Sequence, residues 1–294
     1  MEHQTPTPIT GHTALICLLG SPCAHSISPM MHNASFEALG LDYRYLAFDV
    51  NEATLPTAVA GLKALGARGF NLTMPDKNLM VSLCDDLSTA ARIIGAVNTV
   101  VNENGRLIGH NTDGIGYMQS VKDAGYDIID KKMTLLGAGG AATAILVQAA
   151  LDGLKEISVF VRPTSRFYDR LVHTVDELTK ITDCKIKICD FSDAELLKRE
   201  LADSAILTNG TSVGMAPHED TCPVPEDLVF PDGLIVSDII YNPRETRLLS
   251  MAKHQGNPFF NGSYMLLYQG AEAFRLWTGK EMPVEHIKRE FFSI

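Results

Sequence analysis

One acidic residue lies within a run of glycines and small polar residues at positions 109–116, Gly-His-Asn-Thr-Asp-Gly-Ile-Gly. The carboxylate of Asp113 follows Asn111 and Thr112 directly, and both of these side chains form hydrogen bonds readily. We interpret the run as a glycine-rich bend, because a solvated loop has little need of so many glycines and polar groups together. It predicts a site at which a carboxylate takes part in binding or in proton transfer.

A second glycine cluster, Gly137-Ala138-Gly139-Gly140-Ala141-Ala142, comes directly after the apolar pair Leu135-Leu136. Its Gly-x-Gly-x-x-Ala pattern is typical of a dinucleotide-binding turn when it follows a strand and opens a helix. The first glycine allows the turn, and the second lets the backbone approach a diphosphate. A plain glycine turn in an α/β domain is the alternative, and the strand before and the helix after favour the nucleotide site.

The residues after the next predicted strand bear on the choice of nucleotide. NAD sites commonly carry Asp or Glu there, to bind the ribose hydroxyls. This chain instead has Arg162-Pro163-Thr164-Ser165-Arg166. Two guanidinium groups and two hydroxyls suit a 2′-phosphate, which favours NADP over NAD. A solvated basic turn is the alternative.

Composition limits the class of protein. The 294 residues predict two domains, and 46% hydrophobic residues are ample for two cores. We expect no membrane span and no signal peptide, and we expect the six cysteines to be reduced, as in a cytoplasmic protein. The net charge of −10, without a Lys/Arg cluster, argues against a nucleic-acid partner. Cys23 and His25 have no second ligand pair at metal spacing, so we predict no metal site.

Strand and helix signals give the expected architecture. Strands are predicted at 14–20, 43–50 and 69–73, helices at 29–39 (with Ser28 as N-cap) and 55–65, and a hairpin at 96–110. From residue 132 strands and helices alternate regularly, with helices at 140–151, 166–179 and 194–201. Further helices are expected at 248–255 and 264–277. This rhythm predicts a parallel sheet covered on both faces.

We therefore expect an α/β protein with a cleft between two domains. An N-terminal α/β substrate-binding and catalytic domain would span residues 1–113 and be joined by C-terminal helices from 264–294. A Rossmann-type, doubly wound parallel-sheet domain would span residues 114–263 and bind the dinucleotide.

Small polar residues gather in four segments of the first domain: 20–29, 71–77, 95–99 and 109–116. Together they offer hydroxyls, amides, one lysine and one carboxylate, which could bind a polyhydroxylated carboxylate. Oxidation of a secondary alcohol by a nicotinamide also needs a proton acceptor, and the reverse step needs a donor.

With these motifs the chain resembles the shikimate dehydrogenase family, and most of all its quinate/shikimate dehydrogenase branch. The matching motifs include His25-Ser26-x-Ser28-Pro29, Asn71-x-Thr73-x-Pro75-x-Lys77, Gly95-Ala96-Val97-Asn98-Thr99, Asn111-Thr112-Asp113-Gly114 and Asn209-Gly210-Thr211-Ser212-Val213-Gly214. They occur in the family's order across about residues 14–280.

The resemblance implies reversible, NAD(P)-linked oxidation of the shikimate 3-hydroxyl to 3-dehydroshikimate, in aromatic amino acid biosynthesis. It implies a catalytic pair, Lys77 and Asp113, with Lys77 as the proton donor and acceptor. The implied substrate contacts are Ser26 and Ser28 for the carboxylate, Thr73, Asn98 and Gln269 for ring hydroxyls, and Tyr45 and Tyr241 as pocket walls. The implied cofactor contacts are Gly137, Ala138, Gly139, Gly140, Ala141, Arg162, Thr164, Arg166, Val213, Gly262 and Met265.

The sequence departs from the family pattern at some positions. Asp76 stands where the family usually has His, Asn or an aromatic residue, and Val161 replaces a common asparagine. Thr73 is the shikimate-type residue, and its extra methyl group relative to serine is expected to favour planar shikimate over bulkier quinate.

Other functions stay open or are set aside. Dual use of quinate and shikimate, with NAD or NADP, is the nearest alternative, and a non-catalytic regulator that binds quinate or shikimate is a more distant one. Retention of both Lys77 and Asp113 argues against the regulator. Methylenetetrahydrofolate dehydrogenase is discounted, because no lysine lies four residues after Tyr43 or Tyr45. We expect a small-molecule substrate and a monomer or homodimer.

Overall fold

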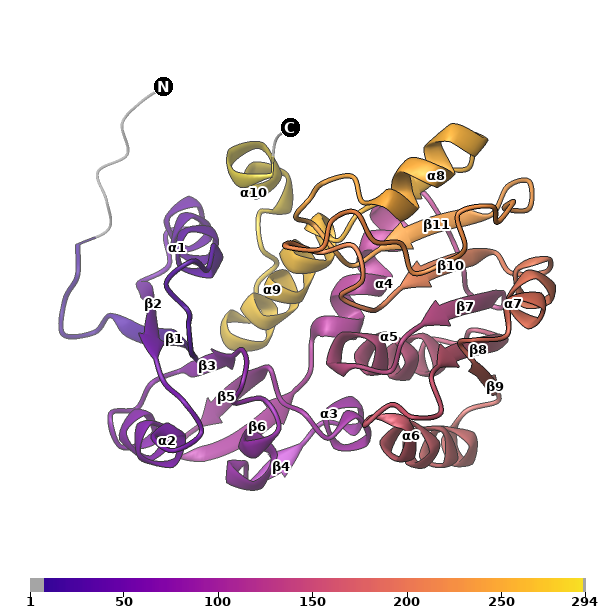
Figure 1. The fold of residues 1–294 in the computed structure, drawn as a ribbon. Helices are drawn as coiled ribbons and strands as arrows, with labels where there is room; N and C mark the ends of the chain where they lie inside the picture. The colour runs from indigo at the N-terminus through magenta and orange to yellow at the C-terminus, as the bar shows by residue number, and fades with distance from the viewer. Residues whose placement is uncertain (1–7, 293–294) are drawn as a thin grey trace. The chain divides into compact units, whose positions relative to one another are not determined.

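The structure is a computed structural model that describes residues 8–292, and its chain divides into two α/β units (Figure 1). Unit 1 contains the chain up to Thr112 and again from Gln269 onward, whereas unit 2 is the continuous segment Asp113–Tyr268. No helix within residues 8–292 has the length and apolar character needed to cross a membrane.

Unit 1 is built on a six-stranded mixed sheet in the order β2-β1-β3-β5-β6-β4. Its strands are β1 (Ala14–Gly20), β2 (Tyr43–Asp49), β3 (Gly69–Leu72), β4 (Asp86–Leu87), β5 (Thr99–Glu103) and β6 (Arg106–His110). Strand β1 runs parallel to β2 and β3, and β5 runs antiparallel to β3 and β6. Its helices are α1 (Ser28–Ala38), α2 (Leu55–Ala64), α3 (Thr89–Ile94) and α10 (Val284–Phe291), with a 3₁₀ turn at Leu79–Leu83.

The predicted hairpin is confirmed by the pairing of β5 with β6. Glu103 pairs with Arg106, so only Asn104 and Gly105 form the loop. Their φ angles of 55° and 90° are both positive, as a type I′ turn requires. The Asn-Gly pair therefore sets the register that brings Thr99 opposite His110 at the other end of the hairpin.

The C-terminal part of the chain completes the core of unit 1. Helix α9 (Ser263–Thr278) carries Trp277, which is fully buried and whose Nε1 donates a hydrogen bond to the Val100 carbonyl oxygen at 2.9 Å. A Cβ at Gly69 would collide with that same oxygen and with the Trp277 indole. Glycine at the start of β3 is therefore what lets the indole reach the sheet.

Unit 2 is built on a wholly parallel six-stranded sheet in the order β12-β11-β10-β7-β8-β9. Its strands are β7 (Lys132–Leu136), β8 (Glu156–Val161), β9 (Lys185–Asp190), β10 (Ile206–Asn209), β11 (Ile235–Asp238) and β12 (Phe259–Phe260). Its helices are α4 (Asp113–Asp123), α5 (Gly140–Leu151), α6 (Tyr168–Ile181), α7 (Ala194–Leu201) and α8 (Arg247–Gln255). The chain first builds the sheet outward from β7 to β9 and then outward from β10 to β12. This reversal is the switch point of a doubly wound fold, as the sequence predicts.

The prediction of a glycine-rich bend around Asp113 is wrong, because Asp113 begins helix α4. Gly114 is buried in that helix, and a Cβ there would clash with the Ala144 carbonyl oxygen and lie 2.6 Å from Gln148 Cβ. The glycine thus serves the close packing of α4 on α5 and not a turn, since that packing outweighs the low helix propensity of glycine.

Candidate functional site

The start of α1 carries the two serines that the sequence assigns to a carboxylate ligand. Ser26 Oγ accepts a hydrogen bond from the Ser28 backbone N–H at 3.2 Å, and Ile27, with no side-chain cap, occupies the N-cap position. The prediction of Ser28 as the N-cap is therefore wrong. Because Ser26 engages the helix end, the hydroxyl of buried Ser28 interacts with Tyr45 instead.

A buried network of polar side chains joins the four polar segments of unit 1. Tyr45 Oη donates to Asn71 Oδ1 at 2.7 Å, and Asn71 Nδ2 donates to the Asn98 carbonyl oxygen at 3.0 Å. Asn98 Nδ2 in turn donates to Thr112 Oγ1 at 3.0 Å, and the Thr112 backbone N–H donates to Asn98 Oδ1 at 2.9 Å. Each of these residues is less than a tenth exposed, so the network fixes where each polar segment ends.

Tyr45 is part of this network and has no exposed surface. Its ring stacks on His32 with a centroid distance of 4.6 Å and an interplanar angle of 12°. Burial raises the pKa of Tyr45 well above its ordinary value, and the hydrogen bond with Ser28 opposes that shift. The phenol is therefore a neutral hydrogen-bonding group that supports Ser28 and Asn71 from behind.

The segments that carry Lys77 and Asp113 are both tied to the Val97–Asn98 segment. The Val97 backbone N–H donates to the Lys77 carbonyl oxygen at 2.9 Å. Asn98 holds Thr112 on both its backbone and its side chain, and Asp113 is the next residue along the chain. Lys77 and Asp113 are themselves half-buried. The backbone at Lys77 is therefore held by Val97, and the backbone before Asp113 is held by Asn98.

Asp76, the departure noted in the sequence, is completely buried. Neither of its carboxylate oxygens has a hydrogen-bond partner within the described part of the chain. Burial raises the pKa of Asp76, and the nearby negative charge of Glu52 raises it further. The buried carboxyl directly before Lys77 therefore lowers the stability of the folded chain.

The remaining predicted substrate residues of unit 1 lie at close contacts of the backbone. A Cβ at Gly20 would collide with the Thr73 methyl group, so that methyl faces Gly20. A Cβ at Gly270 would collide with Met31 Cε, which shows that α9 lies against α1 one residue beyond Gln269. Thr73 and Gln269 are both partly exposed.

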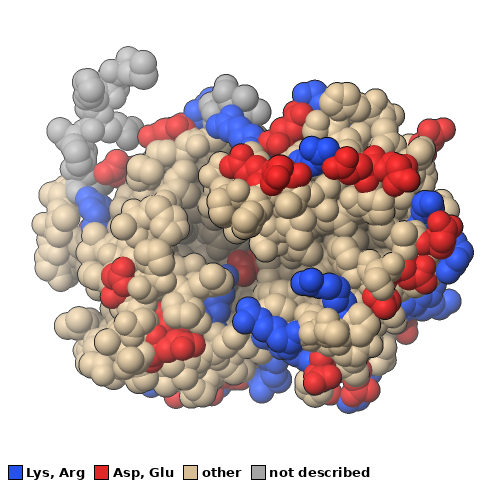
Figure 2. Space-filling model, in the orientation of Figure 1, with Lys and Arg blue, Asp and Glu red and all other residues tan. Residues whose placement is uncertain are grey.

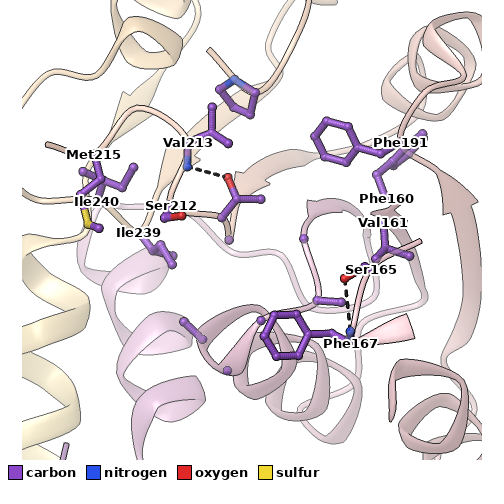
Figure 3. Close-up of a pocket in the computed structure, with 18 of the residues that line it drawn as sticks. Phe160, Val161, Ser165, Phe167, Phe191, Ser212, Val213, Met215, Ile239 and Ile240 are labelled. Carbon is purple, nitrogen blue, oxygen red and sulfur yellow. Dashed lines mark hydrogen bonds between the residues drawn. The ribbon is translucent and has the colours of Figure 1, made fainter. Parts of the chain in front are cut away.

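Unit 2 holds a cavity of about 890 Å³ at the carboxyl ends of its parallel strands. Figure 3 shows two groups of residues facing each other across it. Phe160, Val161 and Phe191, from the ends of β8 and β9, lie on one side, and Ser212, Val213 and Ile240, which follow β10 and β11, lie on the other. The location is where doubly wound sheets bind ligands.

The glycine turn between β7 and α5 has the features that a diphosphate requires. Gly137 has a φ of 102°, and a Cβ there would lie 2.7 Å from Thr211 Cγ2. A Cβ at Gly139 or Gly140 would meet nothing within 4 Å, so both residues border open space in the cavity wall. No side chain of the described residues caps the N-terminus of α5, so its N–H groups remain for an anion.

The turn after β8 supplies positive charge at one side of the cavity. The Ser165 backbone N–H donates to the Arg162 carbonyl oxygen at 2.8 Å, and both residues line the cavity. Arg166 does not line it; its Cζ lies 4.7 Å from the centroid of the Phe167 ring, which does. Thr164 is exposed on the same turn, outside the lining. Figure 2 shows Lys and Arg side chains gathered over α5 and the start of α6.

The structure divides the other predicted cofactor residues into two groups. Val213 lines the cavity, together with Tyr241, which the sequence assigned to the substrate. Gly262 and Met265 are not among the lining residues. Gly262 donates its N–H to the Ile240 carbonyl oxygen at 3.1 Å, and a Cβ there would collide with the Ile239 backbone. It therefore supports the cavity wall from behind.

Sequence reasoning missed several residues of the cavity and of the polar network. Phe167 and Phe191 come from loops that carry no motif, whereas Ser165 lies inside the quoted basic turn. Asn71 and Thr112 lie within the recognised motifs, close to the assigned residues Thr73 and Asp113, and that closeness in sequence was the available signal. No group of three or more His, Cys, Asp or Glu residues within residues 8–292 is placed to hold a metal ion.

Two protein-family models match the chain. One is described as the shikimate dehydrogenase substrate binding domain and matches residues 18–100. The other is described as the shikimate 5′-dehydrogenase C-terminal domain and matches residues 262–290.

Relatives and solved structures match over nearly the whole chain. A protein of Listeria monocytogenes serotype 4b, named shikimate dehydrogenase (NADP(+)), is 52% identical over 99% of this chain and 100% of its own length. An Escherichia coli O139:H28 protein named quinate/shikimate dehydrogenase is 44% identical over 96% of this chain and 97% of its own. The crystal structure of shikimate 5-dehydrogenase from Listeria monocytogenes, in complex with shikimate and NAD, superposes with a TM-score of 0.92. It is 52% identical, with 96% of this chain and 98% of that chain covered.

Proposed function

Because the chain belongs to the shikimate dehydrogenase family, we propose that it catalyses the reversible, NADP-linked interconversion of shikimate and 3-dehydroshikimate. The observation that carries this proposal is the pair of neighbouring residues that hold the two segments: Val97 binds the Lys77 carbonyl oxygen, and buried Asn98 binds Thr112, directly before Asp113. A binding protein needs no such rigid placement of a lysine and a carboxylate, whereas proton transfer does.

The cavity of unit 2 fits a nicotinamide dinucleotide. The open glycine turn and the uncapped end of α5 would hold the diphosphate, and Arg162 with Ser165 would hold a 2′-phosphate. When bound, the nicotinamide supplies or accepts the hydride that the reaction exchanges with carbon 3 of the substrate. The positive charge beside the cavity supports NADP as the preferred cofactor, as in the name of the Listeria relative.

The polar residues of unit 1 fit a polyhydroxylated carboxylate. Ser26 and Ser28, at the start of α1, bind the carboxylate, and the positive end of the helix favours that charge. Thr73, Asn98 and Gln269 bind ring hydroxyls. Tyr45 holds Ser28 and Asn71 in place.

Lys77 and Asp113 manage the proton at the substrate oxygen. In the direction of reduction, the Lys77 ammonium donates its proton to the carbonyl oxygen as that oxygen becomes a hydroxyl. In oxidation, the lysine amine accepts the same proton back. In this proposal the Asp113 carboxylate serves to orient the reacting oxygen of the substrate during the proton transfer.

Oxidation of quinate is the second candidate, favoured by the Escherichia coli relative. The Thr73 methyl group lies against Gly20, in the first of the polar segments, and its effect on the choice between shikimate and quinate stays a prediction.

The test is a matrix of initial rates at the nicotinamide absorbance band, with shikimate and quinate each crossed with NADP and NAD. The proposal expects the highest kcat/KM for shikimate with NADP. Turnover of quinate at a comparable rate would establish the dual-substrate alternative. Binding of shikimate without any turnover would instead indicate the regulator.

Variants of the proposed catalytic pair test its roles. Lys77→Ala and Asp113→Asn should each lower kcat by about 10²–10⁴, the usual contribution of a positioned acid or base, while substrate binding stays near normal. Lys63→Ala is the matched control, because Lys63 lies on α2 of the same unit and pairs with Asp85 at 3.0 Å. A normal kcat in Lys77→Ala would refute the assignment. Light scattering of the purified chain would test the predicted monomer or homodimer.

A further inference from the structure

Two buried polar residues end the neighbouring strands β10 and β11. Asn209 has no exposed surface, Asp238 is 1% exposed, and the two lie opposite each other in the register of the sheet. Asn209 Nδ2 donates to Asp238 Oδ1 at 3.1 Å. The pair therefore sits directly beneath the two loops that leave these strands, 210–216 and 239–242, both of which contribute lining residues to the cavity.

Asn209 uses all of its hydrogen-bonding capacity on the first of these loops and on Asp238. Its Oδ1 accepts from the Thr211 backbone N–H at 3.0 Å and from Thr211 Oγ1 at 2.7 Å. Its Nδ2 also donates to the Val213 carbonyl oxygen at 3.2 Å, and the Val213 N–H donates to Thr211 Oγ1 at 3.1 Å. The Val213 carbonyl oxygen is thus bound by Asn209, and the Val213 N–H is bound by Thr211, whose hydroxyl Asn209 also holds.

Asp238 does the same for the second loop. Its Oδ1 accepts from the Ile240 backbone N–H at 3.0 Å, and its Oδ2 accepts from Thr246 Oγ1 at 2.8 Å. Thr246 is the N-cap of α8 and is 1% exposed. Both oxygens are satisfied, so the carboxylate links the second loop to a helix end and, through Asn209, to the first loop.

We propose that Asn209, Asp238 and Thr246 are positioning residues that hold the cavity wall against the nicotinamide half of the dinucleotide. This inference rests on the proposed function. None of the three lines the cavity; they act through Val213 and Ile240, which do.

The assignment to the nicotinamide half follows from the order of the strands. The glycine turn after β7 takes the diphosphate, and the turn after β8 carries Arg162 and Ser165, on the adenosine side. Strands β10 and β11 lie on the other side of β7, so their loops face the other half of an extended dinucleotide. Figure 3 shows Val213 and Ile240 across the cavity from Val161 and Ser165.

The test compares two ligands on the full chain by calorimetry: NADPH, and adenosine 2′,5′-bisphosphate, which contains only the adenosine half. Asn209→Asp removes both donors and sets one carboxylate against another, so it should weaken NADPH binding by about tenfold or more and lower kcat. The affinity for adenosine 2′,5′-bisphosphate should stay unchanged. The double variant Asn209→Asp/Asp238→Asn restores a donor opposite an acceptor and should recover part of the loss.

Thr208→Val is the matched control, because Thr208 is equally buried and lies one residue earlier on β10. It should leave both affinities as they are. Equal weakening of the two ligands in Asn209→Asp, or unchanged NADPH binding, would overturn the inference. If Asn209→Asp does not fold, the milder Asp238→Asn decides by the same comparison. A wild-type chain that binds shikimate but no NADPH would instead overturn the proposed function, and the inference with it.

Discussion

Replacement of Arg162 by alanine should change the choice of cofactor and little else. Arg162 borders the cavity on a tight turn. Positions 162–166 contain no Asp or Glu that could bind the ribose hydroxyls of NAD. A charge-assisted hydrogen bond contributes about 1.5–3 kcal/mol, which is a factor of roughly 10–150 in kcat/KM. Because Arg162 is exposed, solvent screening favours the lower end, about tenfold.

The assay measures kcat/KM for NADP and for NAD in the oxidation of shikimate, with shikimate saturating, at low and at high salt. Arg162→Ala should lower the NADP value and leave the NAD value nearly unchanged, and added salt should narrow the preference of the wild type. Arg166→Ala is the matched control: its stacking on Phe167 is worth about 0.5–1 kcal/mol at an exposed site, so the loss should stay below about fivefold. Equal losses with both cofactors in Arg162→Ala would refute the 2′-phosphate assignment.

Three further predictions concern stability, measured as thermal or urea unfolding. Lys132→Met should lower the free energy of unfolding by up to about 3 kcal/mol, because buried Lys132 pairs with Glu200 at 2.7 Å and its loss leaves that carboxylate with Ser158 and the more distant Lys187, at 3.6 Å; adding Glu200→Gln should recover part of the loss, and additive losses would contradict the pairing. Asp76→Asn should stabilise the chain more at pH 7 than at pH 3. Burial raises the pKa of Asp76, so the folded chain loses stability as the pH rises above the pKa that Asp76 has in the unfolded chain; a pH-independent effect would contradict this. Gly114→Ala should lower the stability by about 1–3 kcal/mol through overpacking against Ala144, and an unchanged melting temperature would show that α4 moves freely.

The regular part of the fold could be predicted because its signals are local. The helix at 140–151 and the helix at 194–201 have the predicted bounds; the second begins after Asp193, whose side chain accepts a hydrogen bond from the Leu196 N–H. The Asn104-Gly105 turn likewise fixes its hairpin without help from distant residues. Alternation of such elements then gives the parallel sheet of unit 2.

The remainder depends on tertiary contacts that no local pattern reveals. Helix α4 forms over two glycines because α5 packs closely against it, and helix α3, with six residues, is too short to give a clear period. In the candidate site, motif residues could be named in advance. The buried carboxyl of Asp76 and the supporting pair Asn209–Asp238 could not, because burial and hydrogen-bond partners appear only in the folded chain.

Unit 1 is built from two segments that are separated in the sequence by the whole of unit 2, so its parts are synthesised at different times. The strands of its sheet are synthesised before unit 2, whereas Trp277 is synthesised after it. The Trp277 indole donates to the Val100 carbonyl oxygen, and its own carbonyl oxygen accepts a hydrogen bond from Arg68 Nε at 2.8 Å. Unit 2 is a continuous segment and is fully translated before Trp277. Unit 1 can therefore complete its core only after unit 2 has been synthesised, unlike an N-terminal domain that is continuous in sequence. Until then the place beside β3 and β5 that Trp277 occupies stays without its indole.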